Sequence, residues 1–266
     1  MKILYLGDIM GQSGIDVVEQ ELNGLKKQLK PDLVLAQAEN VTEGRGISKS
    51  DFEHLRTLGI DFCTGGNWSL YREDIVEYLN DPKQPIIRPA NYPQSTAGLG
   101  YKYVSSDAGK VLVISLLGQV VGRDANKAVD NPLQVVDAIL NSEQATAKAA
   151  IIVNFHGDYS SEKRIIGYYL DGRVSAVIGD HWHVPTADAM LLPSGTAHIT
   201  DVGMCGSLDS SLGIKLSSVI PRWRDNTKTR NVLESEGRRQ LNGVLVDIDT
   251  KTTLAKDIQF IQKIIA

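Results

Sequence analysis

The stretch VSAVIGDHWH, residues 174–183, leads from an apolar run straight into two of the chain's five histidines, His181 and His183. A short apolar run that a glycine ends is typical of a buried β-strand. Side chains two positions apart in an extended segment point the same way, so both imidazoles would reach one object while Trp182 faces away. In one interpretation that object is a metal ion, and in the other the histidines are a chance surface pair. The rest of the chain has to decide.

Apolar runs of the same kind recur along the chain and alternate with longer amphipathic segments, which predicts a layered α/β domain. Strands are predicted at residues 2–7, 32–38, 60–65, 110–118, 149–155 and 173–179. Helices are predicted at residues 14–30, 48–59, 72–80 and 131–142.

The regions outside this alternation are less regular. Residues 84–93 are predicted as a short strand that enters a proline-rich loop, and residues 196–204 as another strand and loop. The charged segment 221–239 is predicted to be irregular. Residues 240–261 alternate apolar and polar side chains around a turn, which predicts a closing antiparallel hairpin. No internal repeat or low-complexity linker divides the sequence, so we expect a single domain over residues 1–266.

The composition narrows the class of protein. With 28 basic and 32 acidic residues the net charge is -4, so we expect no strong nucleic-acid surface. No apolar run reaches the roughly 18 residues of a membrane span, and the N-terminus lacks a signal-peptide pattern. Two cysteines, Cys63 and Cys205, do not make a disulfide framework. A soluble protein of the reducing cytoplasm fits these features best.

Side chains that can bind metal follow directly after the predicted strands. In an open α/β sheet the carboxyl ends of the strands lie along one edge, where ligands normally bind. We therefore expect seven such side chains to meet at one edge. They are Asp8, Glu39, Asn40, Asn67, His156, His181 and His183.

Two carboxylates, two amide oxygens and three imidazoles are too many for one ion with open positions, but they suit two ions that share a bridging ligand. This mixture of oxygen and nitrogen favours Mn, Fe or Zn over Ca or Mg. Two such ions about 3.5 to 4 Å apart bind a phosphate, activate water and stabilise an in-line displacement. The pattern predicts phosphoester hydrolysis.

Each residue taken alone has a more ordinary interpretation. Asp8 could be a turn residue, Asn40 could cap a helix or form an Asx-turn, and a single histidine after a strand is usually structural. Five separate strand ends would each have to supply a ligand type by chance. The joint pattern therefore favours a metal centre over unrelated surface residues.

Eight strings in this order and spacing resemble the calcineurin-like metallophosphoesterases, and within them the YmdB-like bacterial cyclic-nucleotide phosphodiesterases. They are GDIMG (7–11), AEN (38–40), EGRGIS (43–48), GGN (65–67), RPANYP (88–93), SSEK (160–163), GYYLDGRVSAVIGDHWHVPTAD (167–188) and GTAHITDVGMCG (195–206). The resemblance covers nearly the whole chain. It implies a sandwich of two β-sheets flanked by α-helices, with a dinuclear metal centre at the strand ends.

The resemblance also implies a role for each ligand. One ion would be held by Asp8, Asn40 and His183, and the other by Asn67, His156 and His181, with Glu39 bridging the two. The catalytic set would be Asp8, Glu39, Asn67 and His156, acting on 2',3'-cyclic nucleotides by attack of a metal-bound hydroxide. Where the wider superfamily has a histidine this chain has Met10, and in this branch the asparagine at position 40 takes over.

One departure from the family concerns proton transfer. The family's third motif reads Gly-Asn-His, whereas this chain has GGNW with Trp68 in the histidine's place. That histidine donates a proton to the leaving oxygen, and an indole N–H cannot do so near neutral pH. Losing a general acid typically costs ~10²- to 10⁴-fold in rate. His198 is a conceivable substitute, while Trp68 could stack on a nucleobase or plug the cleft.

Other departures are milder. Asn154 stands where the family has a carboxylate, two residues before the histidine at 156, which could alter the orientation of that imidazole. Asp180 and Trp182 are also unusual beside the paired histidines. Trp68, Arg88 and Asn91 are predicted to contact the substrate, and Ser161 and Lys163 could contact the phosphate. Ordinary surface salt bridging is an equally good account of the charged members.

Three functions stay open at this point. The first is a phosphodiesterase with two divalent ions (Mn, Fe or Zn) and a nucleotide phosphodiester substrate. The second is a catalytically weakened regulator that binds metal and nucleotide on the same fold, motivated by Trp68. The third is a monoesterase or pyrophosphatase, because fold does not fix substrate. The sequence leaves the oligomeric state open, a homo-oligomer included.

Overall fold

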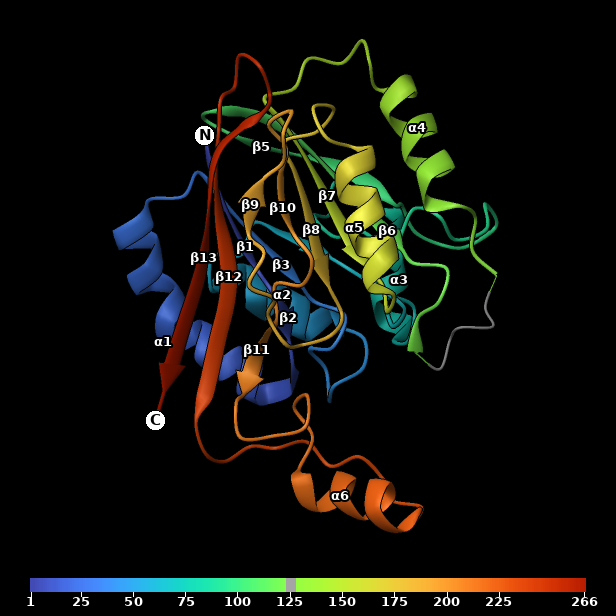
Figure 1. The fold of residues 1–266 in the computed structure, drawn as a ribbon, viewed down its shortest axis with the longest axis vertical. Helices are drawn as coiled ribbons and strands as arrows, with labels where there is room; N and C mark the ends of the chain where they lie inside the picture. The colour runs from blue at the N-terminus through green and yellow to red at the C-terminus, as the bar shows by residue number, and fades with distance from the viewer. Residues whose placement is uncertain (123–127) are drawn as a thin grey trace.

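The computed structural model describes residues 1–122 and 128–266. Two β-sheets face each other and carry helices on their outer faces (Figure 1). This is the predicted α/β sandwich of two sheets flanked by helices. No helix in the described part of the chain is long and apolar enough to cross a membrane.

The first sheet has seven strands, in the order β2-β11-β12-β1-β3-β4 with β13 paired to β12. Its strands are β1 (Lys2–Leu6), β2 (Asp8–Ile9), β3 (Leu33–Gln37), β4 (Phe62–Thr64), β11 (Met204–Ser207), β12 (Arg239–Ile248) and β13 (Ala255–Ile265). β1, β3 and β4 are parallel, whereas β12 and β13 form the predicted closing antiparallel hairpin.

The second sheet has six strands, in the order β5-β6-β7-β8-β10-β9. They are β5 (Tyr101–Ser106), β6 (Gly109–Leu117), β7 (Ala150–His156), β8 (Ala176–Asp180), β9 (Met190–Leu191) and β10 (Ala197–Ile199). β6, β7, β8 and β10 run parallel, so their carboxyl ends lie on one edge.

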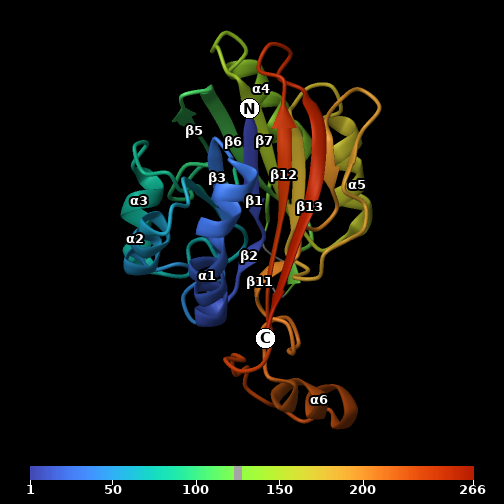
Figure 2. The same ribbon diagram turned by 90° about the vertical axis from the view of Figure 1, so that its left-hand side faces the viewer.

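The helices divide between the two outer faces. α1 (Gly11–Leu29), α2 (Lys49–Thr57), the short 3₁₀ turn η1 (Glu73–Ile75) and α3 (Val76–Asn80) lie on the first sheet. α4 (Pro132–Ser142) and α5 (Ser160–Tyr169) cover the second, and α6 (Leu216–Asp225) stands apart from both sheets in Figures 1 and 2.

The alternation of side chains along β1 explains the layers. Ile3 and Tyr5 point into the core between the sheets, whereas Leu4 and Leu6 point into the core under the helices of the first sheet. All four are fully buried. A strand with both faces covered reads as a continuous apolar run, which is why these strands were predictable from the sequence.

Three predictions about elements were wrong or incomplete. Residues 84–93 form no strand beyond an isolated bridge between Cys63 and Ile86. Residues 216–225 are helical although half of this segment was predicted to be irregular, because α6 is a charged helix with Pro221 in its interior. The sequence also gave no prediction for α5 or β5, since α5 buries only a narrow strip of residues and β5 is a half-buried edge strand.

Candidate functional site

The seven predicted metal ligands meet at the strand ends. Asp8 opens β2, Glu39 and Asn40 follow β3, Asn67 follows β4, His156 ends β7, and His181 and His183 follow β8. Six of them are buried and His181 is half-buried. Residues from both sheets therefore build one centre, which we call the metal centre.

One half of the metal centre joins Asp8, Asn40 and His183. The amide nitrogen of Asn40 donates to Asp8 Oδ1 at 3.0 Å and lies 3.3 Å from His183 Nε2. His183 Nε2 lies 3.7 Å from Asp8 Oδ2. These three side chains are the set that the resemblance assigns to one ion.

The other half gathers around His156. Its Nε2 atom lies 2.9 Å from Glu39 Oε1 and 3.0 Å from Asn67 Oδ1. The His181 ring lies 4.4 Å from the His156 ring, centroid to centroid. Glu39, His156 and His181 offer ligand atoms that all lie within 4.8 Å of one another, a spacing that a metal ion can bridge.

The electrostatics of the centre fit bound cations. No described residue donates a hydrogen bond to the buried Oδ2 atom of Asp8. Burial, reinforced by the nearby Asp180, raises the pKa of Asp8 to about 8, and burial lowers the pKa of His183. A buried carboxylate oxygen without a donor is costly, and a cation removes that cost. The donor set of carboxylate, amide and neutral imidazole is one that divalent transition metals accept.

The backbone of the paired histidines differs from the sequence prediction. β8 ends at Asp180, and His181 and His183 have φ angles of 100° and 63° rather than extended ones. Left-handed conformations of this kind cost of order 1–3 kcal/mol and persist only where the surroundings impose them. Here the Trp182 amide donates to Asp201 and its indole N–H to the Asp158 carbonyl, which holds the turn in place.

This turn sends the two histidines to different partners. His181 Nε2 lies 3.2 Å from Asp158 Oδ1, whereas His183 faces Asp8. The hydrogen bond from His181 lowers the pKa of Asp158 to about 2. The premise that an extended segment aims both rings at one object was therefore wrong, although both rings do reach the metal centre.

A buried carboxylate orients the His156 ring. Asp180 Oδ1 lies 2.6 Å from His156 Nδ1. The other oxygen of Asp180 accepts hydrogen bonds from Asn154, Gln37 and the Tyr5 hydroxyl. A carboxylate behind a ligating histidine fixes the ring orientation and raises its basicity.

Asp180 thus provides the carboxylate that is missing at Asn154. Burial alone would raise the pKa of Asp180 and lower that of His156, but their mutual attraction, with Glu39 also acting on His156, reverses both directions. The sequence held a signal for this pair, because parallel pairing of β7 with β8 sets His156 beside Asp180. Only the unknown register prevented its recognition.

Trp68 lies in the cleft beside the metal centre. Its backbone N–H donates to Glu39 Oε2 at 2.8 Å. Its ring meets Tyr71 edge-on at 5.3 Å, and the Arg45 guanidinium lies 5.1 Å from the ring centroid. The Trp68 ring is therefore held in place by Tyr71 and Arg45 and forms part of the cleft wall next to the predicted ligands.

His198 lies elsewhere. It is fully buried on β10, its Nδ1 lies 3.1 Å from the Val177 carbonyl oxygen, and its ring packs against Gly167 of α5. It is not among the described residues that line the cleft. These contacts give His198 a structural role and no route to the leaving oxygen.

The predicted phosphate contacts of Ser161 and Lys163 are not supported. Lys163 is buried, its ammonium donates to Asp201 Oδ2 at 2.6 Å and to the Asp180 carbonyl at 2.5 Å, and it lies over the Trp182 ring. Ser161 is exposed on α5, and neither residue is among the described residues that line the cleft. Lys163 instead ties α5 to the end of β8.

Arg88 and Asn91 also make backbone contacts. The Arg88 guanidinium donates to the carbonyls of Pro89, Thr96 and Ala97. Asn91 exchanges two hydrogen bonds of 2.7 Å with the backbone of Leu117. Within the described chain neither lines the cleft, so their contact with substrate stays a prediction.

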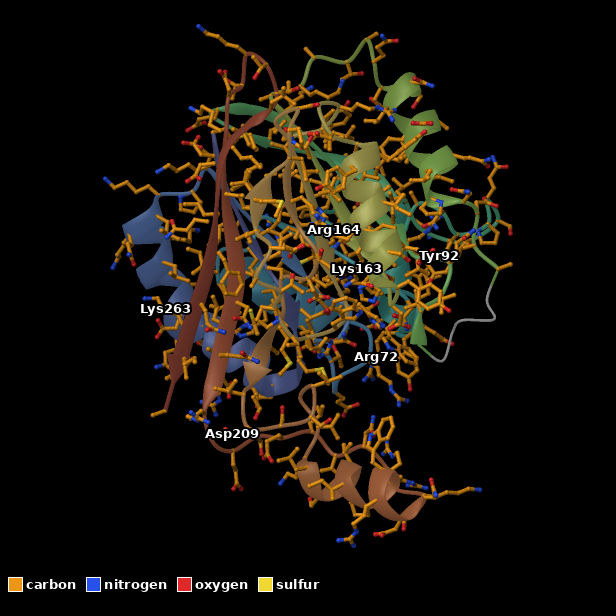
Figure 3. The ribbon with its side chains drawn as sticks, viewed as in Figure 1. Arg72, Tyr92, Lys163, Arg164, Asp209 and Lys263 are labelled. Atoms are coloured by element: carbon orange, nitrogen blue, oxygen red, sulfur yellow. The ribbon has the colours of Figure 1, made fainter. Side chains whose placement is uncertain are left out.

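The cleft has a volume of about 930 Å³ and extends from the metal centre to α6. Its inner end is lined by four of the predicted metal ligands, Glu39, Asn40, His181 and His183, and one wall by Arg45, Trp68, Tyr71 and Arg72. The opposite wall comes from residues 208–238, which join β11 to β12 and which we call the α6 excursion. Figure 3 shows Arg72 on the side of the body that faces this excursion.

Comparisons with known proteins agree with this geometry. A sequence model of the family described as YmdB-like protein matches residues 4–261. A Bacillus subtilis protein named 2',3'-cyclic-nucleotide 2'-phosphodiesterase is 37% identical over 259 residues, covering 97% of this chain and 96% of the relative. A solved structure from Mycoplasma pneumoniae, described as a novel phosphatase, superposes with a TM-score of 0.91 at 30% identity, covering 99% of this chain and 93% of that one.

A more distant structure shares the fold alone. A 5'-nucleotidase structure from Staphylococcus aureus has a TM-score of 0.58 at 14% identity, covering 98% of this chain and 54% of that one. The calcineurin-like sandwich predicted from the sequence is therefore confirmed as the fold.

Proposed function

This chain belongs to the YmdB-like protein family and is a metallophosphoesterase, and we propose that it hydrolyses nucleotide phosphodiesters, with 2',3'-cyclic nucleotides as its substrate class. The observation that carries the proposal is the meeting of seven ligand-type side chains around a buried Asp8 oxygen that accepts no hydrogen bond from the residues the structure describes. The name of the Bacillus subtilis relative supports the substrate class.

The proposed centre holds two divalent ions of Mn, Fe or Zn. One set of ligands is Asp8, Asn40 and His183, the other is Asn67, His156 and His181, and Glu39 is shared. Ions in such a site supply positive charge to the reacting phosphate and acidify water. The identity of the metal is left to experiment, because this donor set accepts several.

The chain's own residues have separate tasks in this proposal. Asp180 holds the His156 ring by its Nδ1 atom, and the Trp68 backbone N–H holds Glu39. Hydrolysis forms one P–O bond from water and breaks one P–O bond to the ribose, whose oxygen finally takes a proton. Because the Trp68 indole gives up no proton near neutral pH, that proton comes from solvent, and good leaving groups should be favoured over poor ones.

The test is turnover of 2',3'-cyclic AMP by manganese-loaded protein, with bound metal counted by elemental analysis. We expect turnover well above Asp8→Ala and His156→Ala blanks, each of which should lose both activity and bound metal. Unchanged activity in either variant would overturn the ligand assignment. Adenosine monophosphate measured in parallel separates a diesterase from a monoesterase.

Trp68 favours a second candidate function, a regulator that binds metal and nucleotide with little catalysis. Its ring stands in the cleft where the family has a proton donor. A Trp68→His variant separates the two candidates. A gain of ~10²-fold or more on an unactivated diester would mark a competent enzyme that lacks only its acid. No gain, with two metals bound per chain, would favour the regulator.

A further inference from the structure

The outer part of the cleft is lined differently from its inner end. The acidic lining residues Glu39 and Asp158 lie near the paired histidines, and Glu43 at the rim is paired with Arg72 at 2.9 Å. Among the described residues, three further arginines line the cleft, namely Arg45, Arg222 and Arg230. The outer cleft is therefore positively charged.

Part of this charge comes from the α6 excursion, through Arg222 and Arg230. The excursion, residues 208–238, holds six basic side chains against four acidic ones, an excess of two positive charges in a chain of net charge -4. Whole-chain composition cannot reveal such a patch. The expectation of no strong nucleic-acid surface rested on that composition.

The two walls of the cleft each present a tryptophan. Trp68 is braced by Tyr71 on the body, while Trp223 on α6 is 82% exposed. Tryptophan is enriched at binding interfaces, because its ring offers a large apolar surface and its indole N–H a polar contact. Aromatic rings combined with a basic groove are the standard platform for single-stranded nucleic acid, since every base can stack. One nucleotide brings a single base, whereas two rings on opposite walls suit at least two.

The chemistry of a 2',3'-cyclic phosphate determines the direction in which a longer RNA chain would run from the metal centre. A 2',3'-cyclic phosphate occupies both lower ribose oxygens, so a longer chain continues only from the 5' oxygen. With the cyclic phosphate at the metal centre, preceding nucleotides must leave along the cleft, toward the arginines and Trp223. The volume of about 930 Å³ lies near the upper end of the roughly 300–1,000 Å³ typical of small-molecule pockets.

Building on the proposed function, we propose that the substrate is an oligoribonucleotide whose 3' end carries a 2',3'-cyclic phosphate. Trp223 stacks on a base upstream of the cyclised nucleotide, and Arg230 contacts a backbone phosphate. Water adds to phosphorus, one P–O bond of the ring breaks, and the freed ribose oxygen takes the proton, so the product is an RNA end with a terminal monoester. The α6 excursion thus selects RNA ends over free nucleotides.

The test compares 2',3'-cyclic AMP with a triadenylate that ends in a 2',3'-cyclic phosphate, using manganese-loaded protein. The measured quantity is the ratio of kcat/KM for the trinucleotide to that for the mononucleotide. We expect roughly a 10-fold or larger preference for the trinucleotide, mainly in KM, as stacking one base predicts. Trp223→Ala should remove most of this preference, and Trp223→Phe should retain it.

Arg224→Ala is the matched control, because it removes one charge from the same helix at a residue paired with Asp225 that is not among the described residues lining the cleft. It should leave the ratio unchanged. Arg230→Ala should lower the salt dependence of trinucleotide KM by about 0.7 in log–log slope, the contribution of one phosphate contact on a single strand. Binding of the triadenylate 3'-phosphate product, followed by calorimetry, gives a readout independent of turnover.

The outcomes separate this inference from the proposed function. A ratio near one, with the mononucleotide turned over, overturns the inference and leaves the proposed function standing. No turnover of either substrate overturns the proposed function, and the calorimetric binding then decides whether the cleft takes RNA at all. A change in oligomeric state on Trp223→Ala, seen by sedimentation, would mean that α6 contacts a second copy and would overturn the inference.

Discussion

The metal centre and the α6 excursion are opposite in construction, although they form two ends of one cleft. Asp8, Glu39, His156 and Asp180 are at most 1% exposed, and each is held by neighbouring polar groups. None of the residues of α6, all of which the structure describes, is buried. The fold therefore buries the predicted ligands in a polar network, whereas it leaves the side chains of α6 at the surface.

The excursion is nevertheless attached at its base. Val219 and Leu233 pack against a small apolar cluster of Met10, Met204 and Ile214. Within the excursion, Arg222 donates to Thr229 and Asn231, which ties the returning chain to the helix. A helix attached in this way keeps its place opposite Trp68 without joining the core. The contrast predicts large effects for changes in the buried network and small ones for changes in the excursion.

The largest effect on stability is expected at Lys163. Lys163→Met leaves the Asp201 carboxylate buried without its cation, and breaking such a pair typically costs about 3–5 kcal/mol. Urea unfolding of the purified variant measures this loss. Lys256→Met, which removes an exposed partner of Asp247, is the matched control and should cost under about 1 kcal/mol. Equal losses of unfolding free energy in both variants would contradict the expected difference between buried and exposed charges.

Metal removal should have the next largest effect. Ions that bind only the folded chain stabilise it by about 2.7 kcal/mol when the free metal is 100 times Kd. Chelation should therefore lower the Tm of the native protein, and it should lower that of Asp8→Asn by less, because this variant has lost one charged ligand of the proposed pair of ions. In metal-free buffer Asp8→Asn should be the more stable of the two, because it removes a buried carboxylate with an unsatisfied oxygen. Differential scanning calorimetry with and without manganese gives both results, and a metal-independent Tm would contradict them.

The Asp180 carboxylate is expected to have a smaller effect, on metal affinity, because it acts through the His156 ring. Asp180→Asn should weaken metal binding by about 10- to 100-fold, the usual cost of losing the partner behind a ligating histidine. Asn154→Asp should also weaken it, since two carboxylates would then share one buried site. The double variant carries one carboxylate again and should recover part of the affinity. Competition with a metal-binding dye measures all three, and Asp137→Asn on the surface is the control.

The sequence predicted the buried strands and the residues that follow them better than it predicted the exposed α6 excursion. Strands with both faces buried, such as β1, are recognisable in the sequence as apolar runs. The residues that follow them could therefore be placed at one edge of the sheets from the sequence alone. The link between His156 and Asp180 escaped because it depends on the register of β7 against β8. The positive φ angles at His181 and His183 have no sequence signal, since only the surrounding contacts impose them.

The excursion was misjudged for a different reason. The apolar side chains of α6, such as Val219 and Trp223, lie on a short helix whose second half begins at Pro221 and is charged, and that half falls in the segment predicted to be irregular. Likewise Lys163 looked like a surface cation, because a buried lysine can be recognised only from its partner, Asp201. Sequence reasoning succeeds here where burial repeats along one segment and fails where it depends on distant partners.

The smallest effect on stability is expected at Trp223. Because its side chain is 82% exposed, Trp223→Ala should change the free energy of unfolding by no more than about 0.5 kcal/mol, within the range of ordinary surface substitutions. Limited trypsin digestion tests the difference in local stability between the α6 excursion and the two sheets. The first cuts should fall in the excursion, after Arg224 or Lys228, because local opening there exposes no core. The nicked protein should keep its metal and its sandwich, and early cuts in the sheets would instead mean that the excursion is an integral part of the folded core.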